Sequence, residues 1–316
     1  MEINDHRLDL KDRLSATNFV GTGSLGMVPF DVFSSNDPGI GTKLLKSFEN
    51  IINTQPQSMF TEGREIYNQP TTGDVLFILK DSPEPCRIET FSADSFAIYG
   101  PTNSEAFIRR LPYLFYNLAE RTRQEDLGLV TAHAAAVAKN GRGILILGDK
   151  GSGKTSLMLA LCLTQGYEMI GNDSIVLGGK GELVIATGSH QINVRLPVAR
   201  KLSLPMRNET ASDNKIDYEI KFPFLPQDLG IRTAGGILPL SVAVRINLHS
   251  DNPDCVISNI PSHEVEALRL SENFSRYIRG IPTPLELSTS GINGHFPDLD
   301  TIQLTEFRNG MVNTLL

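Results

Sequence analysis

The sequence predicts an α/β fold with two parts, a smaller β-containing region in residues 1–100 and a larger α/β domain in residues 101–316. Two observations support this. The wholly apolar run 144–147 precedes a glycine-rich loop and then a stretch of helix formers, which is the order strand, loop, helix. The first hundred residues instead alternate Pro, Gly and Asp turn segments with short strand-like runs.

Residues 1–100 contain three predicted strands, at 75–79, 87–91 and 95–99, and we interpret this region as a lid or a substrate-recognition element. Residues 21–26 also match the pattern G-x-G-x-x-G of dinucleotide-binding loops. The residues after them, Met-Val-Pro-Phe-Asp, are poor helix formers, so we expect a plain surface turn there.

Residues 101–316 begin with a predicted helix that runs from a capping signal at 102–104 to about Arg123 and is interrupted at Pro112. Apolar residues at helical spacing predict a core-facing stripe. The stripe consists of Phe107, Ile108, Leu111, Leu114, Phe115 and Leu118. A strand is expected at 129–137.

Beyond the glycine-rich loop the predicted elements are short and separated by turn signals. Gly166 should end the loop helix. The further expected elements are a strand at 168–171, a hairpin of 174–177 with 183–186, strands at 191–196 and 242–247, and a helix at 262–270. The last forty residues are rich in turn formers and give no information on secondary structure.

The composition is that of a globular protein, with 316 residues of which 40% are hydrophobic and 21% charged. The net charge of −7 and the absence of basic runs argue against nucleic acid or an anionic membrane surface as a partner. No apolar stretch approaches the roughly 20 residues of a membrane span. The polar N-terminus does not resemble a signal peptide, and three isolated cysteines, Cys86, Cys162 and Cys255, fit a reducing cytoplasm.

The strongest motif is Gly148-Asp149-Lys150-Gly151-Ser152-Gly153-Lys154-Thr155, which fills the P-loop (Walker A) pattern G-x-x-x-x-G-K-[ST]. Loop N–H groups and a helix N-terminus then favour the negative charge of a polyphosphate. Lys154 would reach the β- and γ-phosphates, and the Thr155 hydroxyl would bind Mg²⁺. The predicted ATP-binding residues are Gly148, Gly151, Ser152, Gly153, Lys154, Thr155 and Ser156.

Two further residues are candidates for the chemistry. Asp173 ends an apolar segment about twenty residues after Lys154 and is either a carboxylate ligand of the Mg²⁺ or, beside Asn172, a turn aspartate. His133 lies in a run of small apolar residues, where a histidine is either part of the core or a general base or phosphate contact at a strand end.

Three other residues are weaker candidates. His190 and Arg195 follow the predicted hairpin and could face the γ-phosphate or the substrate, although surface strand residues have the same pattern. Arg232 lies in a glycine-containing loop and is a candidate anion clamp. The sequence leaves both interpretations of each residue open.

Residues 133–177 together resemble the catalytic core of the HPr kinase/phosphorylase family. The resemblance comprises His-Ala-Ala-Ala-Val, the glycine-rich motif, and Gln-Gly-Tyr-Glu-Met-Ile-Gly-Asn-Asp-Ser-Ile-Val-Leu. It implies a P-loop domain of the phosphoenolpyruvate carboxykinase type and Mg²⁺-dependent phosphoryl transfer from ATP to a hydroxyl group. It also implies that Thr155 and Asp173 hold the metal, that Lys154 contacts the phosphates, and that His133 lies beside the reacting groups.

The sequence departs from that family at one position. HPr kinases have two consecutive aspartates at the end of this strand and the first is assigned as the base, whereas here it is Asn172. Either Asp173 or His133 serves as base, or positioning and charge neutralisation suffice. We therefore expect a specialised kinase acting on a peptide serine or a small hydroxylated metabolite, with a homo-oligomer left open. The alternatives are a regulatory ATPase or switch and a non-catalytic nucleotide-binding module.

Overall fold

The computed structural model has a mixed α/β architecture, and its described residues are 18–34, 40, 43, 44, 47, 61–62, 75–83, 86–179, 181–205, 220–248, 262–280 and 296–316. The chain forms two compact units. The first contains residues 1–130 and 275–308, and the second contains residues 131–274 and 309–316. The first unit extends beyond residue 100, because the helices that come next pack on the first sheet.

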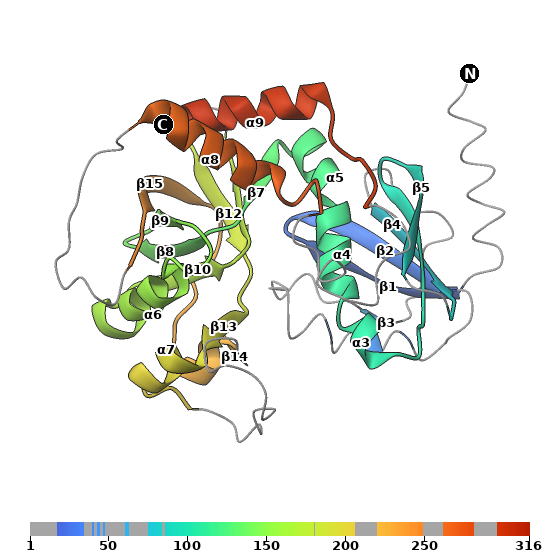
Figure 1. Cartoon of the computed structure of the whole chain (residues 1–316), viewed down its shortest axis with the longest axis horizontal. Coiled ribbons are helices and arrows are strands. Elements are labelled where there is room, and N and C mark those ends of the chain that lie inside the picture. The colour runs from blue at the N-terminus through green and yellow to red at the C-terminus, as the bar shows by residue number, and fades with distance from the viewer. Residues whose placement is uncertain are drawn as a thin grey trace. The chain divides into compact units, whose positions relative to one another are not determined.

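The first unit contains a six-stranded mixed sheet (Figure 1). The strands, in the order in which they pair, are β3 (Thr61–Glu62), β1 (Asn18–Leu25), β2 (Val28–Ser34), β4 (Val75–Asp81), β6 (Ser95–Gly100) and β5 (Arg87–Ser92). The central strands β2, β4 and β6 are parallel, and the outer strands β1 and β5 run antiparallel to their neighbours. The three strands predicted in this region are confirmed as β4, β5 and β6.

Three helices follow this sheet, α3 (Glu105–Ile108), α4 (Leu111–Leu118) and α5 (Glu120–Glu125). Ser104 caps α3 by accepting a hydrogen bond from the Phe107 backbone N–H at 3.4 Å. The predicted interruption is confirmed, since α4 begins anew with Pro112 in its first turn.

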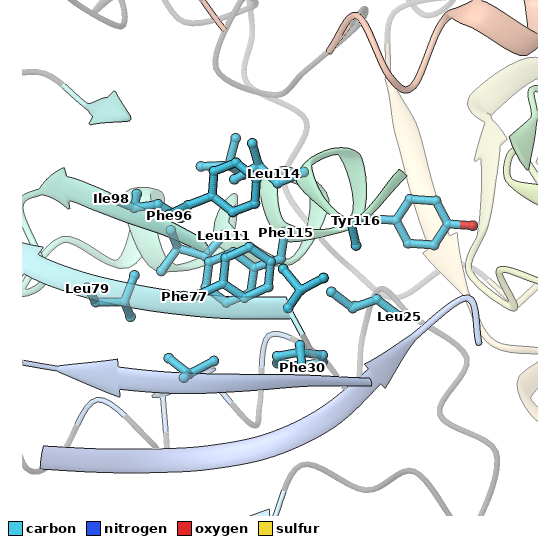
Figure 2. Close-up of a cluster of buried hydrophobic side chains, with 14 of the residues drawn as sticks. Leu25, Phe30, Phe77, Leu79, Phe96, Ile98, Leu111, Leu114, Phe115 and Tyr116 are labelled. Carbon is cyan, nitrogen blue, oxygen red and sulfur yellow. The ribbon is translucent and has the colours of Figure 1, made fainter. Parts of the chain in front are cut away.

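The predicted apolar stripe is confirmed as core (Figure 2). Phe115 of α4 stacks on Phe77 of β4 with ring centroids 4.0 Å apart, and Phe30 of β2 packs edge-on against both rings. Because aromatic rings bury large apolar areas, these contacts bind α4 to the sheet.

Residues 21–26 do not form a plain surface turn, so that expectation is wrong. Most of the segment belongs to β1, which pairs antiparallel with β2. Only Gly26 and Met27 form the turn, and both have positive φ, 54° and 78°. A two-residue turn of this kind matches the twist of a hairpin, and its pattern has no relation to a dinucleotide.

The second unit contains a seven-stranded mixed sheet (Figure 1). The strands, in the order in which they pair, are β10 (Glu168–Asn172), β8 (Ala135–Lys139), β9 (Arg142–Leu147), β15 (Leu238–Arg245), β12 (Val184–Gly188), β11 (Ile175–Gly178) and β7 (Leu129–Ala132). Strands β9 and β15 are parallel although almost a hundred residues separate them in the chain.

Helix α6 (Lys154–Gln165) packs against this sheet through Met158 and Leu159, which are fully buried. It ends at Gly166 in the left-handed conformation, as predicted. A separate pair of strands, β13 (Ile192–Arg195) and β14 (Lys221–Phe224), contributes to the same core. The remaining elements are α7 (Leu196–Lys201), the short 3₁₀ helix η1 (Pro226–Leu229), α8 (His263–Ser275) and α9 (Ile302–Leu315).

One expectation for this part of the chain is wrong. The single strand expected at 129–137 is divided at His133 into β7 and β8, which pair with different neighbours. The turn-rich C-terminal region contains the fourteen-residue helix α9. The predicted hairpin is confirmed as β11 and β12, and the helix expected at 262–270 is confirmed as α8.

No helix within the described ranges is long and apolar enough to cross a membrane. The cysteines Cys86 and Cys162 are free thiols, and burial raises the pKa of each to about 11. Cys255 lies outside the described residues.

Candidate functional site

The glycine loop, residues 148–155, connects the end of β9 to the start of α6. Gly151 and Gly153 have positive φ values of 88° and 96°, and Gly153 is the N-cap of α6. Because side chains other than glycine rarely adopt this conformation, both glycines are required for the loop to reverse direction at the helix N-terminus. This placement is the one predicted from the motif.

A segment that follows β15 holds the glycine loop in place. The Leu248 backbone N–H donates to the Ser152 carbonyl at 2.9 Å, and the Ile246 N–H donates to the Leu147 carbonyl at 2.9 Å. A Cβ on Gly153 would lie 2.8 Å from the Leu248 side chain, and one on Gly148 would lie 2.7 Å from the Ile246 carbonyl oxygen. Glycine is thus needed at both positions to admit residues 246–248.

Lys154 turns its amine back into the glycine loop. Its Nζ donates to the carbonyl oxygens of Gly148 at 2.8 Å and Asp149 at 3.1 Å, and only 6% of the residue is exposed. Ser152 lies beside it, and its buried Oγ has no hydrogen-bond partner among the described residues. A buried hydroxyl without a partner is costly, so this atom suits a ligand that supplies an acceptor.

Thr155 and Asn172 join the glycine loop to the end of β10. The Thr155 hydroxyl donates to Asn172 Oδ1 at 3.0 Å, and Asn172 is 1% exposed. The backbones of Gly171 and Gly188 meet so closely that a Cβ on Gly171 would lie 2.5 Å from the Gly188 Cα. This close approach lets the Asn172 N–H donate to the Ser189 carbonyl at 2.7 Å, which fixes where β10 ends.

Asp173 and His133 meet at the backbone of Asp173. Asp173 has a positive φ of 65°, which aspartate adopts more readily than most residues. Its carbonyl oxygen lies 3.0 Å from His133 Nδ1, and because a carbonyl only accepts, the ring nitrogen must donate. The structure thus brings His133, Asp173, Asn172, Thr155 and the glycine loop into one continuous set of contacts.

The break at His133 has a partner far along the chain. The His133 N–H donates to Asn273 Oδ1 at 2.7 Å, and Asn273 Nδ2 donates to the His133 carbonyl at 3.1 Å. The side-chain amide of Asn273 therefore replaces a neighbouring strand at the point where β7 ends and before β8 begins.

The weaker candidates do not all join this set. Arg232 is exposed and donates to the Gly166 carbonyl at 3.4 Å, at the opposite end of α6 from the glycine loop. A twelve-residue helix is about 18 Å long, so Arg232 is not brought to the loop. Burial lowers the pKa of His190 to about 4, and Arg195 ends β13 at the start of α7.

Sequence reasoning missed three residues around the site. Arg245 ends β15, and its Nε donates to both carboxylate oxygens of Glu266 on α8 at 2.7 and 2.6 Å. Its Nη1 lies 3.9 Å from Asp149 Oδ1 in the glycine loop. Asn273 is the third. Nothing in the local pattern marks these residues, because their partners lie from 21 to 140 residues away in the chain.

The polar groups at the site are oxygens and nitrogens suited to an anion and a hard cation. In the described part of the chain no group of three or more His, Cys, Asp or Glu residues could hold a metal ion by itself. A magnesium ion bound to phosphates needs only one or two protein carboxylates, because phosphate and water oxygens supply the rest. The Thr155 hydroxyl and the Asp173 carboxylate are thus a chemically adequate donor set for such an ion.

No family model matches this chain, and no curated protein matches it. Among solved structures, that of the Hpr(Ser) kinase/phosphatase from Coxiella burnetii aligns with 39% of this chain and 73% of its own, at 20% identity and a TM-score of 0.24. A TM-score this low carries no argument about this chain.

Proposed function

We propose that this chain is an ATP-dependent kinase that transfers the γ-phosphoryl group to a hydroxyl acceptor. The observation that supports this most is the position of Lys154, whose amine lies inside a glycine loop at the N-terminus of α6. A buried ammonium surrounded by backbone groups at a helix N-terminus is a strongly anion-attracting arrangement. The resemblance of residues 133–177 to HPr kinases points to the same activity.

Phosphate would bind by exchange of partners. Lys154 Nζ now donates to two loop carbonyls, and a phosphate oxygen is a better acceptor because it is charged. The Ser152 hydroxyl would gain the acceptor that it lacks, and the loop N–H groups would point at the same oxygens. These groups would also stabilise charge on the phosphoryl group during its transfer.

Mg²⁺ is part of this proposal, and Thr155 and Asp173 are the residues that would hold it. When bound, the ion would neutralise charge on the phosphates. The Thr155 hydroxyl already points to the end of β10 through its bond to Asn172. The backbone of Asp173, fixed by His133, sets where its carboxylate begins.

The acceptor hydroxyl must lose a proton, and Asn172 cannot take it. Because His133 Nδ1 donates to the Asp173 carbonyl, its Nε2 is the nitrogen that accepts a proton in the neutral ring. We therefore assign the base role to His133, with Asp173 as the alternative carboxylate. The acceptor would be a peptide serine or a small hydroxylated metabolite.

The test is incubation of the full chain with Mg-ATP, first alone and then with pools of serine peptides and of hydroxylated metabolites. Mass spectrometry should find the gain of one phosphoryl group on an acceptor, dependent on the intact Lys154 side chain. Steady phosphate release without any acceptor would instead indicate a regulatory ATPase.

A specific observation keeps a second candidate open, a non-catalytic nucleotide-binding module. The buried Asn172 amide is bonded to Thr155 at the position where HPr kinases have a carboxylate base. Tight ATP binding with neither transfer nor hydrolysis would favour this module over the kinase.

A further inference from the structure

Helix α8 contacts the site at two points on one of its faces. Glu266 and Asn273 are seven residues apart in this helix, which is close to two full turns, so their side chains leave the same face about 10 Å apart along the axis. Both side chains end on residues that adjoin the glycine loop or the end of β10. No local sequence pattern marks either residue.

At the first point, Glu266 holds Arg245. The Glu266 side chain is 7% exposed, and both of its oxygens accept hydrogen bonds from Arg245 Nε. Arg245 pairs in parallel register with Leu147, the last residue of β9 before the glycine loop. Its Nη1 lies 3.9 Å from Asp149 Oδ1, so the loop begins beside a guanidinium whose position α8 determines.

At the second point, Asn273 holds the backbone of His133. Both polar groups of its amide are used, one by the His133 N–H and one by the His133 carbonyl. The His133 ring then contacts the Asp173 carbonyl, and Asp173 adjoins Asn172, the partner of Thr155. Asn273 therefore fixes His133, and through His133 it fixes the position of Asp173.

We propose that α8 is the positioning helix of this site, with Glu266 and Asn273 as its two positioning residues. Glu266 sets the shape of the glycine loop through Arg245, and Asn273 sets the imidazole of His133 through its backbone. The kinetic part of this proposal rests on the proposed kinase function, whereas its structural part does not. Loss of the Glu266 contact should therefore weaken nucleotide affinity, whereas loss of the Asn273 contact should lower kcat.

The structural part is tested by amide hydrogen exchange on the full chain without nucleotide. We expect Asn273→Ala to speed exchange at the His133 amide by about tenfold or more, because its acceptor is lost. Leu268→Ala is the matched control, since Leu268 is on the same helix and 72% exposed. Exchange at His133 no faster than in the control would overturn the proposal.

The kinetic part compares kcat with the dissociation constant of a fluorescent ATP analogue. We expect Asn273→Ala to lower kcat about tenfold with affinity within about twofold, and Glu266→Gln to weaken affinity about fivefold or more. Equal losses in both quantities, or an unchanged kcat in Asn273→Ala despite faster exchange, would overturn the positioning role.

Failure of the proposed kinase function is distinguishable from failure of this proposal. If the wild-type chain binds the ATP analogue but transfers no phosphoryl group, the kinase proposal falls. The exchange measurement and the affinity of Glu266→Gln then still decide whether α8 positions the site. Unchanged affinity in Glu266→Gln would overturn the role of Glu266.

Discussion

Each unit of this chain buries a cationic side chain among polar groups, Arg123 in the first and Lys154 in the second. The two cations differ in the partners that surround them. Arg123 is fully buried, and its guanidinium donates to the carbonyls of Leu25 at 2.6 Å and Gly26 at 2.9 Å. It also pairs with Glu120 and lies 4.4 Å from the centre of the Tyr116 ring. The guanidinium thus connects the β1–β2 turn to α5 by hydrogen bonds.

The hydrogen bonds around Arg123 continue through three further side chains and end at Asp300. Glu120 accepts from Gln124 at 2.9 Å, and Gln124 accepts from Arg308 of α9 at 2.8 Å. Arg308 in turn holds both carboxylate oxygens of Asp300 at 2.7 Å. Each charge in this network has several fixed partners, and the loss of one partner would leave another charge buried without compensation.

The glycine loop is the opposite case. Lys154 Nζ donates to the neutral carbonyls of Gly148 and Asp149, Ser152 Oγ has no partner among the described residues, and Asp173 has a positive φ. Polar groups whose partners can be improved, on a backbone held in uncommon conformations, are characteristic of binding sites. The quality of the partners, more than burial, thus separates Arg123 from Lys154, the cation that we propose to bind phosphate.

The comparison is tested most strongly by Lys154→Ala. We expect phosphoryl transfer to fall about a thousandfold or more, since the group that stabilises the transferred charge is lost. The free energy of unfolding should fall by only about 1–2 kcal/mol, because the two carbonyls that lose their donor are neutral and Asp149 is exposed. Asp173→Ala should likewise abolish transfer. A Lys154→Ala protein with full activity, or one that unfolds easily, would break the comparison.

Arg123→Ala should have the largest effect on stability. Removing the guanidinium leaves Glu120 buried and without its cation, which costs about 3–5 kcal/mol of unfolding free energy. The matched control is Arg121→Ala in the same helix, whose partner Glu125 is half exposed and whose loss should cost about 1 kcal/mol or less. Urea denaturation measures both, and equal losses would contradict a special role for Arg123.

The pH dependence of stability sharpens the view of the second unit through His190. Burial lowers the pKa of its imidazole from 6.5 to about 4, so the unfolded chain takes up a proton at a higher pH than the folded one. Above pH 6.5 His190 is neutral in both states and does not lower the free energy of unfolding. As the pH falls from 6.5 towards 4, His190 lowers the free energy of unfolding by roughly 2–3 kcal/mol. His190→Gln should remove this part of the difference between urea denaturation at pH 7.5 and pH 4.5. An unaltered pH dependence in the variant would show that other groups cause it.

Asn172→Asp should have the smallest effect on transfer. Thr155 keeps its acceptor, but the second carboxylate oxygen would face the Gln191 carbonyl to which Asn172 Nδ2 now donates at 3.4 Å. Because this carboxylate is buried without a cation, we expect a loss of about 3 kcal/mol in stability, with transfer activity retained or raised because a base is added near the hydroxyl. Complete loss of transfer would mean that the amide itself contacts the acceptor.

The parts of the fold that follow local rules were predictable from the sequence. The left-handed end of α6 at Gly166 and the restart of α4 at Pro112 each depend on one residue's backbone preference. The break in the strand expected at 129–137 does not depend on a local backbone preference. It breaks at His133 because an amide 140 residues later satisfies that backbone, and no local pattern encodes such a partner.

The same limit applies to the candidate site. The glycine loop was legible because glycine conformation and motif spacing are local properties, whereas Arg245, Glu266 and Asn273 reach it only through the tertiary fold. The helix α9 was missed for a related reason. Its buried Arg308 belongs to the closed network of the first unit, and turn-forming composition hid the apolar contacts of Leu304 and Met311.

The segment after β15 has a consequence for synthesis of the protein. The glycine loop is complete at residue 155, yet Leu248, whose N–H donates to the Ser152 carbonyl of the loop, is translated much later. During translation the glycine loop is therefore made before the segment that packs against it. On the proposed function, premature termination before residue 248 should leave a loop unable to retain nucleotide. On the proposed function, the capacity to bind ATP would appear only after residue 248 has been translated.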